Sequence, residues 1–118
     1  KACFMPTTYL EPFGGVSVEA LMSGTPVIAS DFGAFPEIVK HGLNGYRFRT
    51  IGEAAYYAGT EQLDLLMPNY DIRADAIERY SMDVIKYKYQ DYFEQVLGAY
   101  TGKADFYSSW HGRIDRYQ

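Results

Sequence analysis

Residues 2–30 read ACFMPTTYLEPFGGVSVEALMSGTPVIAS. The apolar run that opens this stretch ends at Pro6, as expected for a buried strand that leads into a loop. From Val16 the apolar residues recur at helical spacing, and Gly24, with the proline that soon follows it, ends the helix. The β-branched run that begins at Val27 then predicts a second strand. The stretch therefore predicts a strand, a loop, a helix and a strand.

The next residues continue the alternation of helix and strand. Pro36 fits the first position of a short helix that runs to His41 and stops at Gly42. Tyr46–Arg49 then alternate apolar and polar side chains, which predicts a third strand near an edge of the sheet. Strands separated by helices require parallel pairing with right-handed crossovers. Residues 2–49 therefore predict an open α/β sheet of about three parallel strands.

The second half of the chain is expected to be mainly helical. Glu53–Met67 fit one or two helical segments, and Asp71–Tyr80 fit another. Ser81 is a suitable N-cap for a long helix over about Met82–Leu97, and Gly98 is its expected stop.

The composition is that of an ordinary soluble domain. Apolar residues make up 47% and charged residues 22% of the 118 residues, which argues against a disordered or a membrane protein. The net charge of -4 gives no attraction to phosphate backbones, so no nucleic-acid partner is expected. The single cysteine, Cys3, cannot form an internal disulfide, and no signal-peptide pattern opens the chain. A cytoplasmic location is therefore expected.

The length suits one domain and is too short for two. We expect a partial domain at residues 1–100 and a tail or crossover segment at residues 101–118, with a short helix around Tyr107–Asp115. The chain opens without Met and places an apolar strand within its first residues, so we expect it to be cut from a longer protein. The neighbours of that strand would then be missing, which predicts a homo-oligomer formed through the exposed sheet edge.

Two carboxylates and two glycines surround the predicted start of the first helix. Glu11 lies in the loop after the first strand, Gly14 and Gly15 lie at the transition to the helix, and Glu19 follows one turn later. Helix N-termini offer unpaired N–H groups to anions, and glycines let a phosphate approach the backbone closely. Carboxylates accept hydrogen bonds from vicinal hydroxyls. Because a nucleotide sugar presents a diphosphate between two hydroxyl-bearing rings, this arrangement predicts nucleotide-sugar binding.

The same residues resemble a known motif. The spacing of Glu11 and Glu19 is similar to the E-x7-E motif of retaining GT-B glycosyltransferases of family 4, also called glycosyl transferases group 1. The similarity continues through Gly24–Asp31 and Pro36–Glu37, and it covers about residues 2–48. It implies a Rossmann-like, C-terminal donor-binding domain, which is part of a doubly wound parallel sheet with helices on both faces.

The resemblance also implies roles for individual residues. Glu11 is the catalytic candidate, whose carboxylate would bind hydroxyls of the transferred hexose, and Glu19 would bind the ribose hydroxyls. Backbone groups at the helix start would contact the donor sugar and the diphosphate, and these belong to Phe13, Gly14, Gly15 and Val16. The expected donor is a nucleoside diphosphate sugar. No cofactor and no metal are expected, because the family generally works without one and the sequence has no convincing Asp/His cluster for a divalent ion.

Other parts of the family's machinery have no counterpart in this sequence. In the family, an Arg and a Lys on earlier strands clamp the diphosphate, and a separate N-terminal domain contacts the acceptor. Neither precedes Lys1, so the isolated chain is expected to be inactive. Peripheral membrane association is expected only through that N-terminal domain, and the acceptor is unknown.

Other interpretations fit parts of the pattern. Taken alone, Glu19 is typical of a residue that complements a helix dipole, and Glu11 of a solvated loop carboxylate. Asp31 fits a turn, and His41 fits a helix end. For the function, the main alternative is a non-catalytic module that binds nucleotides or nucleotide sugars. A sugar-nucleotide epimerase is less favoured because it does not require the Glu11-to-Glu19 arrangement.

Overall fold

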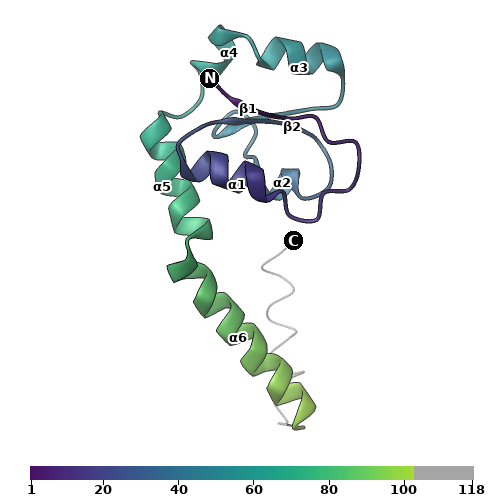
Figure 1. Cartoon of the computed structure of the whole chain (residues 1–118), viewed down its shortest axis with the longest axis vertical. Helices are drawn as coiled ribbons and strands as arrows, with labels where there is room; N and C mark the ends of the chain where they lie inside the picture. Colours follow the sequence, from purple (N-terminus) through teal and green to yellow (C-terminus); the bar gives the residue numbers. More distant parts are fainter. Residues whose placement is uncertain (103–118) are drawn as a thin grey trace. The chain divides into compact units, whose positions relative to one another are not determined.

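A computed structural model describes residues 1–102 of the chain, with the three strands and six helices of Figure 1. The elements, in chain order, are β1 (Cys3–Met5), α1 (Gly15–Met22), β2 (Val27–Ser30), α2 (Phe35–Ile38), β3 (Gly45–Phe48), α3 (Ile51–Tyr57), α4 (Thr60–Leu63), α5 (Asn69–Tyr80) and α6 (Met82–Tyr100). The chain forms two compact units, Lys1–Ser81 and the part that begins at Met82. The helix predicted around Tyr107–Asp115 lies outside the described residues, as does the predicted tail beyond residue 102.

A parallel sheet with the order β1-β2-β3 forms the centre of the first unit. Val27 of β2 pairs with Cys3 on one side and with Gly45 on the other. Because the strands lie in sequence order, right-handed crossovers place α1 and α2 on the same face of the sheet. Figure 1 shows these two helices on one side, with α3 and α4 on the other. The predicted α/β, Rossmann-like fold is confirmed.

The central strand β2 is buried along its whole length because both faces of the sheet are covered. Val27 and Ala29 contribute to one core and Ile28 to the other, as the alternation of side chains along a strand requires. The larger core also takes side chains from the segments around α1, α2 and α5, namely Val18, Leu21, Phe35, Ile38, Val39, Ile72 and Ala76. The smaller core adds Phe48 and Ala54. β2 therefore anchors the loops that leave its two ends.

The first strand is more exposed than predicted. Within residues 1–102, β1 pairs only with β2, and Cys3 is half-buried. Phe4 is 52% exposed, although its ring stacks on that of Phe48 at a centroid distance of 5.5 Å. The prediction of a buried strand is therefore wrong for the described residues, because the face of β1 that carries Phe4 is only partly covered.

The third strand confirms its predicted place at a sheet edge. Within the described residues, β3 pairs only with β2. It begins at Gly45, one residue before the predicted start, where a Cβ would overlap the carbonyl of Val27. Its polar member, Arg47, is half-buried, whereas the other residues of the strand are buried.

The second helix is shorter than the predicted helix over Pro36–His41. α2 ends at Ile38, and Val39 adopts an extended backbone with φ −94° and ψ 106°. Asn44 accounts for this early end, because its side-chain oxygen accepts a hydrogen bond from the Lys40 N–H at 2.8 Å and so replaces a helical acceptor. The predicted end at His41 is therefore wrong.

The helices after the sheet match the predicted segments, with different boundaries. α3 and α4 are the two segments expected between residues 53 and 67. α3 begins earlier than expected because Thr50 and Glu53 form a capping box, in which the Thr50 hydroxyl accepts from the Glu53 N–H at 3.2 Å and the Glu53 carboxylate accepts from the Thr50 N–H at 3.3 Å. α5 covers the predicted helix and begins directly after Pro68.

The last described helix continues past its predicted stop at Gly98. α6 runs to Tyr100, and the residue with a left-handed backbone beyond it is Gly102, at φ 68°. Gly102, and not Gly98, therefore supplies the conformation that typically terminates a helix. Ser81, directly before α6, has the non-helical backbone expected of an N-cap, with φ −61° and ψ 149°.

Candidate functional site

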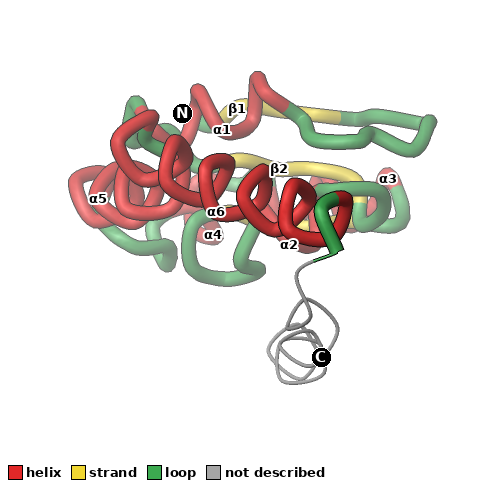
Figure 2. The backbone as a smooth tube through the Cα atoms, turned by 90° about the horizontal axis from the view of Figure 1, so that it is seen from below, coloured by secondary structure: helices red, strands yellow, loops and turns green. Residues whose placement is uncertain are grey.

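The loop between β1 and α1 extends beyond the end of the strand before it returns to the helix (Figure 2). Near its start, Ser30 Oγ donates a hydrogen bond to the Thr7 carbonyl at 2.8 Å. Near its end, the Ala34 N–H donates to the Glu11 carbonyl at 2.8 Å. Gly33 lies so close to this point that a Cβ would sit 2.8 Å from the Glu11 nitrogen. The loop is thus attached to the neighbouring segments at both ends, and Gly33 has a packing role as well as a turn role.

Gly14 sets the start of α1. It is the buried N-cap residue, and its left-handed backbone, with φ 73° and ψ 52°, favours glycine. A Cβ at this position would lie 3.1 Å from the ring of Phe35. The Gly14 carbonyl accepts from the Ser17 N–H at 2.9 Å, and no side chain caps the helix.

The start of α1 is accessible. Gly15 and Val16 are exposed, and their N–H groups form no hydrogen bond with any residue between 1 and 102. Unpaired N–H groups at a helix start carry the positive end of the helix dipole. An oxyanion can therefore bind here without displacing a capping side chain. In contrast to Gly15 and Val16, Ser17 is fully buried, and its Oγ has no hydrogen-bond partner in the described part of the chain.

Glu11 is held by hydrogen bonds to both of its carboxylate oxygens. Oε1 accepts from the Gly14 N–H at 3.1 Å, and Oε2 accepts from the Tyr9 hydroxyl at 2.6 Å. The Tyr9 hydroxyl and the backbone N–H groups of Gly14 and Phe13 lower the pKa of Glu11, against the opposing effect of burial. Glu11 is therefore ionised near neutral pH, and its carboxylate is fixed beside the start of α1 by its bond to the Gly14 N–H.

Phe13 connects this loop to α5. Its ring packs edge-on against Tyr80, with centroids 6.4 Å apart and an interplanar angle of 77°. The Tyr80 hydroxyl accepts a hydrogen bond from Arg79 Nη2 at 2.6 Å. Burial raises the pKa of Tyr80, so its hydroxyl remains protonated at neutral pH. The C-terminal end of α5 thus supports one side of the loop.

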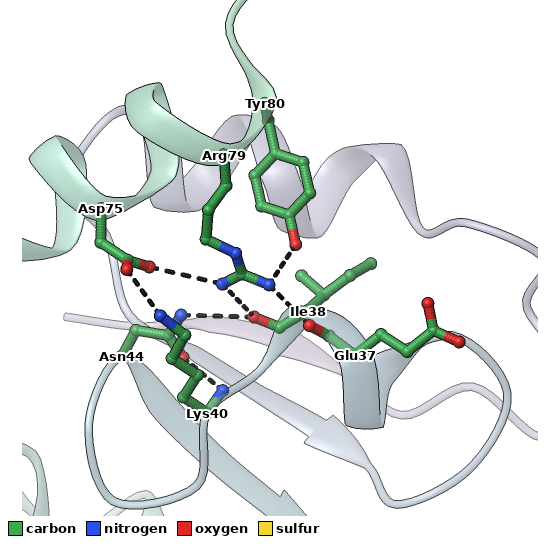
Figure 3. Close-up of polar contacts among 7 residues, drawn as sticks. All are labelled: Glu37, Ile38, Lys40, Asn44, Asp75, Arg79 and Tyr80. Atoms are coloured by element: carbon green, nitrogen blue, oxygen red, sulfur yellow. Dashed lines mark hydrogen bonds and ion pairs between the residues drawn. The ribbon is translucent and has the colours of Figure 1, made fainter. Parts of the chain in front are cut away.

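Arg79 also binds the end of α2, as Figure 3 shows. Its guanidinium donates to the Glu37 carbonyl at 2.6 Å and to the Ile38 carbonyl at 3.4 Å. Asp75 accepts from the same group at 3.3 Å and pairs with Lys40 at 2.6 Å. The guanidinium therefore satisfies carbonyls that the short helix leaves unpaired, and it joins α2 to α5.

Glu19 stands one turn into α1 with an exposed side chain. Residues four apart lie on the same face of a helix, so Glu19 shares the face of Gly15. Its carboxylate has no hydrogen-bond or ion-pair partner among residues 1–102.

The predicted site residues thus have different surroundings. The structure joins Glu11 directly to Gly14, places Phe13 in contact with α5, and leaves Gly15 and Val16 open at the helix start. Tyr9 is a further residue of the site that the sequence did not predict, although it lies two residues before Glu11 and its hydroxyl contacts that carboxylate. The loop pattern alone does not indicate which way a tyrosine hydroxyl points.

A second group of polar residues surrounds a cavity of about 300 Å³ near the carboxyl end of β3. Its lining comprises Asp31, His41, Arg47, Arg49, Glu53 and Tyr57. Asp31 pairs with both arginines, at 2.8 Å from Arg49 and 3.4 Å from Arg47. The predicted turn role of Asp31 therefore omits these ion pairs. They could have been anticipated because Asp31 and the two arginines lie at the same end of neighbouring parallel strands.

No group of three or more His, Cys, Asp or Glu side chains within residues 1–102 is arranged to hold a metal ion. In the same range, no helix is both long enough and apolar enough to cross a membrane.

Comparison with protein families gives a match over most of the chain. The family described as glycosyl transferases group 1 matches residues 1–79 of the 118 residues. The chain belongs to this family. The match includes β1, the loop with Glu11, the start of α1 and nearly all of α5. The resemblance inferred from the spacing of Glu11 and Glu19 is thereby confirmed at the level of the family.

Individual relatives of this group 1 chain are glycosyltransferases. It is 36% identical over 94 residues to a phosphatidyl-myo-inositol mannosyltransferase from Mycolicibacterium smegmatis, with 75% of this chain and 24% of that protein covered. It is 51% identical over 41 residues to an uncharacterised glycosyltransferase from Methanocaldococcus jannaschii, with 35% of this chain and 10% of that protein covered. It is 42% identical over 52 residues to a D-inositol 3-phosphate glycosyltransferase from Streptomyces scabiei, with 44% of this chain and 11% of that protein covered. The chain thus spans about a quarter or less of the length of these relatives.

Proposed function

We propose that this chain is the donor-binding part of a retaining glycosyltransferase that transfers a hexose from a nucleoside diphosphate sugar to an acceptor. One observation carries the proposal: the Glu11 carboxylate is fixed by the Gly14 N–H beside an uncapped helix N-terminus. Membership of the group 1 family supports glycosyl transfer in general. The identity of the donor and the roles of individual residues are those that the resemblance to retaining glycosyltransferases implies, and the geometry of the site supports them.

In this proposal the diphosphate binds at the start of α1. The free N–H groups of Gly15 and Val16 offer hydrogen bonds to phosphate oxygens, and the helix dipole adds attraction for negative charge. When the bond between the sugar and the diphosphate breaks, negative charge grows on the leaving nucleotide. The N–H groups at the helix start are already oriented toward this charge, so they stabilise it without reorganisation.

Glu11 is assigned to the hexose. Since its pKa is lowered, the side chain is ionised at neutral pH and accepts hydrogen bonds from sugar hydroxyls. A carboxylate in this state does not protonate a leaving group. Its role near the reaction centre is therefore to bind and orient the transferred sugar.

Glu19 is assigned to the ribose. Its free carboxylate shares a helix face with Gly15, so it lies along α1 from the proposed diphosphate position. The two oxygens of a carboxylate match the two vicinal hydroxyls of a ribose. The nucleotide would thus extend from the helix start along the exposed face of α1.

Mannose is the first hexose to test. The relative from Mycolicibacterium smegmatis is named as a mannosyltransferase, and its similarity covers 75% of this chain. The described site contains no feature that distinguishes one hexose from another, so glucose serves as the comparison.

Calorimetric titration tests the assignments with GDP-mannose, GDP, UDP-glucose and UDP as ligands. We expect Glu19→Ala to weaken a sugar nucleotide and its parent diphosphate alike, about tenfold, because both contain ribose. Glu11→Ala should weaken only the sugar nucleotide, by a similar factor. Glu61→Ala on α4, an exposed glutamate on the opposite side of the sheet, is the control and should leave binding unchanged. Absence of binding by the unmodified chain, or binding that neither site variant alters, contradicts the proposal.

We further propose that the 118 residues bind the donor without completing transfer. The match covers 24% of the length of the mannosyltransferase that the chain resembles, and none of the residues assigned above is a candidate for binding the acceptor. Incubation with radiolabelled GDP-mannose or UDP-glucose and inositol phospholipid acceptors should yield no labelled product. Clear transfer by the chain alone would show that its own residues complete the active site.

A further inference from the structure

Tyr9 is the one described side chain that donates a hydrogen bond to the Glu11 carboxylate. Its hydroxyl lies 2.6 Å from Glu11 Oε2, a distance typical of a charge-assisted O–H···O⁻ bond. Tyr9 is 62% exposed and is not among the residues that pack against either core, so core packing does not explain where its hydroxyl lies. The described contact that holds the Tyr9 hydroxyl is therefore its bond to Glu11.

The bond has a specific effect on what Glu11 can bind. A carboxylate has about four lone-pair directions on its two oxygens. One direction on Oε1 is used by Gly14 and one on Oε2 by Tyr9. The remaining directions are available to hydroxyl groups, and they are fixed in space because both oxygens are held. A sugar that binds here does not have to immobilise the carboxylate first, which lowers the entropic cost of binding.

We propose that the Tyr9 hydroxyl is a positioning group that holds the Glu11 carboxylate for the sugar of the donor. Tyr9 then sets how strongly the site prefers a nucleoside diphosphate sugar over the nucleoside diphosphate alone. The inference rests on the proposed function, in which Glu11 binds the sugar of the donor. It adds a residue that neither the spacing of the two glutamates nor the family match assigns.

The variant that tests this role is Tyr9→Phe, which removes only the hydroxyl. The matched control is Tyr56→Phe on α3, since Tyr56 is also 62% exposed and its hydroxyl makes no hydrogen bond among residues 1–102. Affinities for GDP-mannose, GDP, UDP-glucose and UDP are measured by calorimetry. Tyr9→Phe should weaken the sugar nucleotide that binds best about three- to tenfold and leave its parent diphosphate unchanged. Tyr56→Phe should alter neither.

Two results of the titrations would overturn the positioning role. One is an equal loss of affinity for the sugar nucleotide and the diphosphate, which indicates general damage to the loop. The other is unchanged affinity for both ligands in Tyr9→Phe.

A second readout separates this inference from the proposed function. The pKa of Glu11 is measured by ¹³C NMR of its carboxyl carbon in the chain without ligand. It should be higher in Tyr9→Phe than in the unmodified chain, because the hydroxyl that stabilises the carboxylate is gone. An unchanged pKa shows that Tyr9 does not hold Glu11 in solution and overturns the inference even where nucleotide sugars bind. Failure of the unmodified chain to bind any of the four ligands overturns the proposed function, and the sugar role of Tyr9 with it, whatever the pKa shows.

Discussion

At the scale of single residues, the loop before α1 depends on Gly14 and Glu11. Gly14 turns the backbone into the left-handed region, and the N–H at that turn binds the Glu11 carboxylate. The same residue therefore starts the helix and fixes the acid. Left-handed backbone costs most residues about 1–2 kcal/mol, so a substitution at Gly14 affects both features together.

Gly14→Ala should lower the free energy of unfolding by about 2 kcal/mol. Backbone strain contributes about 1–2 kcal/mol, and the new Cβ would press on the Phe35 ring at 3.1 Å. Gly15→Ala is the matched control, because its Cβ would meet nothing within 4 Å and its backbone is helical. Gly15→Ala should leave the free energy unchanged or raise it by up to about 1 kcal/mol. Urea denaturation measures both, and equal effects of the two variants would show that the left-handed turn is not required.

The bond between Tyr9 and Glu11 should stabilise the fold only within a window of pH. The pKa of Glu11 is lowered in the folded state. The contribution of its carboxylate to stability is therefore fully present above the unfolded pKa of about 4.3, and it is lost as the pH falls through the pKa of the folded state. The pKa of Tyr9 is raised, chiefly by its bond to Glu11. The contribution of the protonated hydroxyl to stability is therefore present below the unfolded pKa of about 10, and it is lost as the pH rises through the pKa of the folded state. The difference in urea midpoint between the unmodified chain and Tyr9→Phe should therefore be constant around neutral pH and vanish in acid. A difference that persists in acid would exclude the carboxylate as its cause.

At the scale of elements, α2 is too short to be stable by itself and depends on α5. Only Phe35–Ile38 are helical, and the Arg79 guanidinium binds carbonyls at the end of this turn (Figure 3). The backbone just before α2 also donates to the Glu11 carbonyl through Ala34. Arg79 therefore stabilises a turn that is attached directly to the loop of the candidate site.

Arg79→Ala should lower the free energy of unfolding by about 2 kcal/mol, because it removes charge-assisted bonds to two carbonyls. The Glu37 carbonyl then has no described donor, whereas the Ile38 carbonyl keeps its bond from the Asn44 side chain at 3.3 Å. Arg73→Ala on the same helix is the control, since Arg73 is exposed and has no described partner. Its effect should stay within about 0.5 kcal/mol. Thermal and urea unfolding check the pair, and similar losses in both variants would contradict the role of Arg79.

Much of this element structure could be predicted because glycine and proline mark its boundaries. Gly24 and Pro26 end α1 as expected, and the β-branched run after them forms β2. The end of α2 could not be predicted in this way, because it depends on a side chain, Asn44, that reaches back to Lys40. The end of α6 could not be predicted from Gly98 either, because a glycine inside a helix and a glycine that ends one can have the same sequence pattern.

The candidate site could be predicted only in outline. The spacing of Glu11 and Glu19 and the glycines between them indicated a helix start suited to an anion, and the structure leaves that start uncapped. The partners of Glu11 required coordinates, because a loop has no periodicity from which the direction of Tyr9 could be inferred. The contacts of Arg79 with Glu37 and Ile38 also required coordinates, since they join segments about 40 residues apart.

At the scale of the whole molecule, β1 is the most exposed of the three strands in the described sheet. Within the described residues it has a partner strand on one side only, and Phe4 on its face is half-exposed. Unpaired strand edges with exposed apolar side chains promote association between chains.

We therefore expect the chain to self-associate at high concentration through β1. Phe4→Lys should shift it toward the monomer, because a charged side chain at an open strand opposes pairing with a second copy. Ile51→Lys is the control, since Ile51 is another highly exposed apolar residue and lies at the start of α3. Light scattering over a concentration series measures the molar mass. A strict monomer at the highest concentration, or equal dissociation by both variants, would contradict association through β1.

The most direct test of the central claim is a titration of the ¹⁵N-labelled chain with GDP and UDP, followed by backbone NMR. If the diphosphate binds at the start of α1, the amide signals of Gly14, Gly15 and Val16 should shift most, with smaller changes at Glu11 and Glu19. Signals around the cavity at Arg47 and Arg49 should stay in place. Shifts that concentrate at that cavity, or no change at the start of α1 at saturating nucleotide, would contradict the assignment of this helix start as the donor site.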